Sequence, residues 1–142
     1  MLFATTRSIF NSGETTKKLI RLPDLNLIMK EFILIFRADY QDIESVSAEE
    51  MRKRNNRWMD WLDDLIAQNA LVEGGNHLNP GGKVLRHNGT ISEGPFREPK
   101  ESVLGYILIL ASSPDEAVEL AKDCPILAGE GTSVEVREIG IV

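Results

Sequence analysis

The segment of residues 93–101, Glu-Gly-Pro-Phe-Arg-Glu-Pro-Lys-Glu, combines residue types that are well suited to chemistry. Its glycine and prolines restrict the backbone to a defined bend, and its charged side chains surround one aromatic ring. One interpretation is a rigid loop whose charges are solvated. The other is a loop that directs carboxylates and a lysine into a cleft, where a carboxylate can move a proton. The second interpretation makes Glu93 a candidate catalytic residue and gives these candidate ligand-binding residues: Gly94, Pro95, Phe96, Glu98, Lys100 and Glu101.

Four residues outside this segment are further candidates. His77 is either a surface histidine in a polar loop, the commoner case, or a second proton-transfer group. Arg37 ends an apolar run, so its side chain either extends to water or holds an anionic ligand, since a guanidinium binds carboxylates through two hydrogen bonds. Trp58 and Trp61 lie on one side of a predicted helix, either as core or pocket wall, the commoner case, or as a specific binding platform. We count Arg37, Trp58 and Trp61 as candidate ligand-binding residues and His77 as a candidate catalytic residue.

The sequence contains no recognised cofactor motif. It has no phosphate-binding glycine loop, no Gly-x-Gly-x-x-Gly, no His-Glu-x-x-His and no Cys-x-x-Cys. The two histidines, His77 and His87, lie near Glu73 and Glu93, but their spacing fits no recognised metal site. We therefore expect neither a metal nor a cofactor.

The composition limits the partners and the location that we expect for this protein. The net charge of −6 argues against a nucleic-acid binder, because such proteins need cations to replace phosphate counterions. No apolar run approaches the roughly 20 residues that span a bilayer. The single cysteine, Cys124, permits no intrachain disulfide, which is compatible with the reducing cytoplasm that we expect as its location.

Periodicity predicts the elements that position these residues. Residues 32–36 and 106–110 are continuous apolar runs typical of strands, and residues 134–137 alternate as a half-exposed strand. Two capping boxes, Ser47 to Glu50 and Ser113 to Glu116, each precede an amphipathic helix. We expect the first helix to end at Gly74-Gly75. Asn88-Gly89 predicts a hairpin with a type I′ turn between residues 83–87 and 90–92.

The first 28 residues differ from the rest because they show no clear period. We expect residues 1–28 to be a peripheral extension that contributes little to function, and residues 29–142 to form one domain. An extension of this kind arises when translation starts upstream of the domain.

This order of elements predicts an α+β fold, the ferredoxin-like split βαβ arrangement with an antiparallel sheet. Both helices then cover one face of the sheet. The runs 32–36 and 106–110 are nevertheless apolar on both sides, whereas a strand with one exposed side alternates. The simplest cover for the second face is the sheet of a second copy. We therefore predict a homodimer in the form of a closed two-chain α/β barrel.

The chain also resembles the YCII-related (DGPF-motif) family of bacterial proteins over residues 30–140. That family carries Asp-Gly-Pro-Phe, an acidic residue, Lys-Glu, and an apolar strand that opens with Gly-Tyr. The matching residues here are Glu93-Gly94-Pro95-Phe96, Glu98, Lys100-Glu101 and Gly105-Tyr106. Glutamate replaces the family's aspartate at position 93, which moves the carboxylate outward by one methylene and weakens a role that needs exact placement.

The resemblance implies two function classes. One is a homodimer whose pocket holds a small ligand, with an anion as one candidate. The other is a small cofactor-free lyase or isomerase in which Glu93 or His77 moves a proton. A histidine–aspartate pair is a suggested catalytic site in related members, and His77 is the residue here that can fill a similar role. We favour the first class because no nucleophile–base pair is visible and the motif carboxylate is shifted.

Overall fold

The computed structural model describes residues 20–22, 27–94 and 99–141 of the chain. Its strands are β1 (Ile20–Leu22), β2 (Leu27–Ala38), β3 (Leu71–His77), β4 (Gly82–Leu85), β5 (Ile91–Gly94), β6 (Ser102–Ala111) and β7 (Ser133–Glu138). Its helices are α1 (Tyr40–Glu44), α2 (Ala48–Ala67) and α3 (Pro114–Ala121), with short 3-10 turns at Pro99–Glu101 and Pro125–Ala128.

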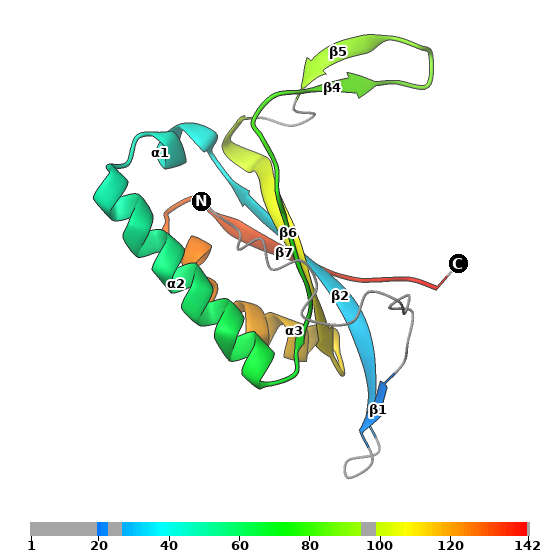
Figure 1. The fold of residues 1–142 in the computed structure, drawn as a ribbon. Helices are drawn as coiled ribbons and strands as arrows, with labels where there is room; N and C mark the ends of the chain where they lie inside the picture. The colour runs from blue at the N-terminus through cyan, green and yellow to red at the C-terminus, as the bar shows by residue number, and fades with distance from the viewer. Residues whose placement is uncertain (1–19, 23–26, 95–98, 142) are drawn as a thin grey trace.

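The main sheet has the spatial order β3-β6-β2-β7, and every pair in it is antiparallel. Together with α2 between β2 and β3, and α3 between β6 and β7, this is a split βαβ arrangement. The predicted α+β fold is therefore confirmed. Figure 1 shows α1, α2 and α3 on the same side of this sheet.

Both predicted helix starts are confirmed. The Ser47 hydroxyl accepts a hydrogen bond from the Glu50 amide at 3.2 Å, and the Ser113 hydroxyl accepts one from the Glu116 amide at 3.1 Å. Each bond satisfies an amide that has no partner within its helix. Pro114 stands in the first turn of α3, where its missing N–H is not needed.

The core lies between the sheet and the helices. Alternate residues of β2 and β6 point into it, and their partners come from the buried side of α2 and from α3. The largest fully buried side chains are Trp58, Phe32, Phe36, Leu34, Leu65, Leu71, Leu104, Ile107 and Ile109. Each large apolar side chain buried in this way contributes about 1.5–3 kcal/mol.

The prediction that the first helix ends at Gly74-Gly75 is wrong. The α2 helix ends at Ala67, and Asn69 follows with a φ of 54°. The amides of Asn69 and Ala70 donate to the carbonyls of Ile66 and Leu65 at 2.9 and 2.8 Å, the pattern of a Schellman motif. Asparagine tolerates this left-handed conformation, so it ends the helix in place of glycine.

The glycine pair instead belongs to β3, where the register with β6 is irregular. Gly75 has a φ of 65°, and a Cβ built on it would lie 1.5 Å from the Tyr106 carbonyl oxygen. Only glycine allows this approach of the two strands.

The predicted hairpin exists, but its predicted turn type is wrong. The Gly89 amide donates to the Arg86 carbonyl, and the Arg86 amide donates to the Thr90 carbonyl, each at 2.9 Å. Gly89 has a φ of 83°, whereas Asn88 does not have a positive φ. A type I′ turn needs positive φ at both central residues. The connection is instead a three-residue loop with glycine in the left-handed position.

The boundary predicted between residues 28 and 29 falls inside β2. The strand β1 pairs antiparallel with its first residues, Leu27 to Met29. That residues 1–28 contribute little to function stays a prediction.

Candidate functional site

One end of the sheet brings several of the predicted residues together. Here β2 ends, β6 begins and β3 ends, next to α1 (Figure 1). Gly105 of β6 pairs with Phe36 on one side and with His77 on the other. The following paragraphs refer to this region as the α1 end of the sheet.

Arg37 is fixed at the α1 end by two partners. One guanidinium nitrogen donates to the main-chain carbonyl of Glu101 at 3.0 Å. Two others approach the same carboxylate oxygen of Glu135, Oε1, at 3.3 Å each. The Arg37 side chain is 20% exposed, so it lies at the boundary between the sheet and solvent.

Tyr106 and Asn76 lie on the same face as Arg37. Asn76 pairs with Tyr106 across the strands, and its amide nitrogen lies 3.0 Å from the Tyr106 hydroxyl. Tyr106 pairs in turn with Ile35, the residue two positions before Arg37. Sequence reasoning did not select Asn76 or Glu135 as site residues. Two sequence features could have identified such residues. Glu135 lies in the alternating strand, and Tyr106 places a hydroxyl inside an apolar run.

Tyr40 of α1 is hydrogen-bonded to the α1 end of the sheet. Its hydroxyl donates to the main-chain carbonyl of Leu78 and lies 3.4 Å from that of Val103. The aromatic ring thereby links α1 to the ends of β3 and β6. Burial raises the pKa of Tyr40, and the nearby Glu44 carboxylate acts in the same direction, so the phenol stays protonated at neutral pH.

His77 lies at the α1 end but on the other face of the sheet from Arg37. Because His77 pairs with Gly105 and Gly105 pairs with Phe36, which is buried in the core, the register assigns His77 to the helix side. Partial burial lowers the pKa of His77, and a hydrogen bond with the Leu104 backbone acts in the opposite direction. The imidazole is therefore neutral at pH 7 and able to accept a proton.

Glu93 lies apart from these groups on β5. It pairs across the hairpin with Lys83, whose ammonium nitrogen is 3.0 Å from its carboxylate oxygen. The Glu93 side chain is 82% exposed. Gly94 ends the same strand, opposite Gly82, while the exposed side chains of Lys100 and Glu101 lie next to the start of β6. Pro95, Phe96 and Glu98 lie outside the described residues.

Trp58 and Trp61 belong to the core. Their rings meet edge to face with centroids 5.4 Å apart, and Phe36 completes the cluster at 4.9 Å from Trp58. Trp58 is 2% exposed and Trp61 is 4% exposed. The Trp61 indole nitrogen donates to the Leu120 carbonyl at 3.2 Å, which joins α2 to α3.

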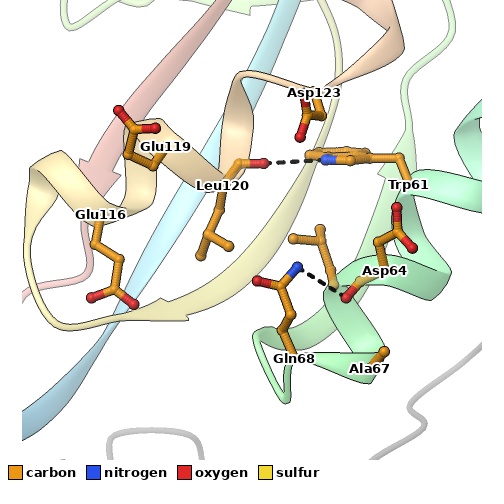
Figure 2. A pocket seen from close by; sticks show the side chains of 9 residues that line it. Trp61, Asp64, Ala67, Gln68, Glu116, Glu119, Leu120 and Asp123 are labelled. Carbon is orange, nitrogen blue, oxygen red and sulfur yellow. Dashed lines mark hydrogen bonds between the residues drawn. The ribbon is translucent and has the colours of Figure 1, made fainter.

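Trp61 also borders an open pocket of about 460 Å³ between α2 and α3 (Figure 2). Four carboxylates surround it, those of Asp64, Glu116, Glu119 and Asp123. An anionic ligand would meet like charge there, so this pocket does not suit the ligand predicted from the sequence. Within the described part of the chain, no three acidic, histidine or cysteine side chains are arranged to hold a metal ion.

The face that the helices leave uncovered carries two ordered rows of side chains. The strand register aligns Arg137, Ile33, Leu108 and Glu73 across β7, β2, β6 and β3. The next row is Glu135, Ile35, Tyr106 and Asn76 in the same strand order. The two central strands therefore present apolar and aromatic groups between charged or polar edges. We call this surface the open face.

Fold and site together define a ferredoxin-like α+β domain with a polar cluster at the α1 end of its sheet. The model of the YCII-related domain matches residues 32–140, so the chain belongs to the YCII-related family. An uncharacterized protein of Rhizobium meliloti (strain 1021) is 33% identical over 113 residues, which cover 72% of this chain and 88% of the relative. Among the described helices, none has the length and apolar character needed to cross a membrane.

Proposed function

We propose that this YCII-related protein functions as a homodimer joined through the open face, and that the α1 end of each sheet binds a small anionic ligand. The observation that carries the dimer is the pattern of the open face. Ile33, Ile35 and Leu108 are half-buried within a single copy, and none of the described helices lies over them. A second sheet would remove the rest of their surface from water.

Charge complementarity supports a second copy as the occupant. A twofold axis that runs along the strands, midway between two facing sheets, places the β7 edge of one copy against the β3 edge of the other. Arg137 then faces Glu73 of the partner subunit, because both belong to the same row. The interface is self-complementary, as a twofold contact requires. Two pairs of this kind form in each dimer.

The ligand proposal rests on Arg37 and its neighbours. A guanidinium on the same sheet face as a phenol hydroxyl and an amide is suited to a small carboxylate or phosphate. The Glu135 carboxylate is paired with the Arg37 guanidinium in the single chain, and the Glu135 side chain is 40% exposed. The pair is only partly exposed, so a bidentate anion would have to replace the Glu135 contacts with two hydrogen bonds of its own.

The alternative of a cofactor-free lyase or isomerase has less support. Glu93 is exposed and paired with Lys83, and His77 belongs to the opposite face of the sheet from Arg37. A general acid or base must lie within hydrogen-bond reach of the reacting group. No described contact joins these three groups in one cleft.

Sedimentation equilibrium tests the dimer. We expect the wild-type chain to sediment with twice its 15.9 kDa mass, and Leu108→Asp to sediment as a folded monomer because it buries a charge in the interface. Val118→Asp on α3 is the matched control, since Val118 is an exposed apolar residue on the helix side. A wild-type monomer at micromolar concentration would refute the proposal.

Thermal shift measurements test the ligand site with inorganic phosphate, succinate and benzoate. We expect at least one of these anions to raise the melting temperature of the wild type, and Arg37→Gln to abolish the rise. Arg57→Gln, which removes an exposed arginine of α2, should leave it unchanged. The ligand proposal fails if no anion stabilises the protein or if Arg37→Gln responds like the wild type.

A further inference from the structure

The hairpin formed by β4 and β5 is a separate two-stranded sheet. Figure 1 shows it projecting past the α1 end of the main sheet and turning away from α2. Among the described elements, the two strands pack substantially only on each other. The hairpin is therefore an arm and not a part of the core.

The arm exposes a pair of large apolar side chains. Leu85 and Ile91 pair directly across the two strands, so their side chains share one face of the arm. Leu85 is 71% exposed and Ile91 is 62% exposed. The Lys83–Glu93 ion pair nearer the root is also exposed and adds little stability.

An isolated two-stranded hairpin of this length is marginally stable in water, and it needs an apolar surface to pack against. The chain's own sheet does not supply one, because neither strand has a substantial contact with it. Leu85 and Ile91 together form the kind of exposed patch that marks an interface.

We infer that this arm packs its Leu85–Ile91 face against a second copy of the chain. The inference rests on the proposed dimer. The arm extends away from α2, toward the side of the main sheet that a second copy would cover (Figure 1). A twofold axis along the strands keeps the α1 ends of both copies together. Each arm then reaches the α1 end of the partner's sheet.

This arrangement has a consequence for the ligand site. Arg37, Tyr106 and Asn76 share the open face, which is the face that the proposed partner covers. The partner's arm closes that side and excludes water from it. A site assembled from both copies binds its ligand only in the dimer.

The test compares dimer dissociation constants by sedimentation equilibrium. We expect Leu85→Ser/Ile91→Ser to weaken the dimer by about tenfold or more, as truncation of buried interface anchors does. The control is Val118→Ser/Leu127→Ser, which removes two exposed apolar side chains from the helix side and should leave the dissociation constant unchanged. Circular dichroism checks that all variants keep the fold.

Hydrogen exchange of residues 83–93 gives a second readout. We expect protection of these amides to increase as the protein concentration rises through the dissociation constant. A wild-type dimer whose affinity is unchanged by Leu85→Ser/Ile91→Ser, or whose arm protection does not depend on concentration, would overturn the arm inference alone. A wild-type monomer would instead overturn the proposed dimer and with it this inference.

Discussion

Arg137 on β7 and Glu73 on β3 lie at opposite ends of one row of side chains across the open face, with Ile33 and Leu108 between them. The row therefore has a positive end, an apolar middle and a negative end. A surface with this order matches a copy of itself that is turned by a twofold axis along the strands.

Charge exchange across this row tests the geometry of the dimer. We expect Arg137→Glu and Glu73→Arg each to weaken the dimer by about tenfold, because each converts two attractive pairs into repulsive ones. The double variant restores attraction with reversed polarity. Sedimentation equilibrium at low salt should show recovery of most of the lost affinity. Additive losses in the double variant would contradict this pairing.

Gly75 and Gly89 are a matched pair for backbone strain, because both have positive φ. Gly75→Ala should destabilise the chain by at least about 3 kcal/mol, because its Cβ would overlap the Tyr106 carbonyl oxygen. Gly89→Ala should lose only about 1–2 kcal/mol, since nothing lies within 4 Å of its added Cβ. Urea denaturation measures both values. Equal losses would show that β3 relaxes away from β6.

Trp58 joins α2 to the sheet through Phe36, with ring centroids 4.9 Å apart. Trp58→Ala should reduce the free energy of unfolding by about 3–5 kcal/mol, because it leaves a large cavity in the core. Met59→Ala, at the next position of the same helix but 37% exposed, should change it by less than about 0.5 kcal/mol. Chemical denaturation compares the two. A small loss for Trp58→Ala would mean that the core refills the space.

His77 has a pKa below its ordinary value of 6.5 in the folded state, with burial as the main cause. The unfolded chain therefore binds a proton at His77 more readily than the folded chain does. The contribution of neutral His77 to stability is complete above pH 6.5 and is lost as the pH falls below it. An NMR titration of the imidazole should give a midpoint below 6.5. A midpoint at or above 6.5 would contradict this assignment.

Cys124 is 2% exposed, and burial raises the pKa of its thiol to about 12. The thiolate is the reactive form, so Cys124 should not react with a thiol reagent at pH 8 in the folded protein. Unfolding in urea should make it react fully. Fast labelling of the native protein would reveal local opening between α3 and β7.

The fold could be predicted from sequence because its signals are local. Capping serines, apolar strands and a helical stripe that contains Trp58 all specify their elements without distant contacts. Helix and turn ends were harder to predict, since Asn69 can adopt the conformation more often supplied by glycine. The helix therefore ended before the glycine pair.

The site could be predicted only in part, because it depends on strand register. The sequence indicates Arg37 at a strand end, but it does not show that Glu135, 98 positions away, meets its guanidinium. The face of the sheet to which His77 belongs follows from its pairing with Gly105. One residue of shift would move it to the other face. Such information lies in the pairing of strands and not in any one segment.

Arg37 is anchored by the main-chain oxygen of residue 101 and not by the Glu101 side chain. Every amino acid offers that same oxygen, so the anchor survives any replacement at position 101 that preserves the path of the backbone. Replacement of Glu101 by another residue should thus leave Arg37 in place. Comparison of side chains alone would overlook the contact.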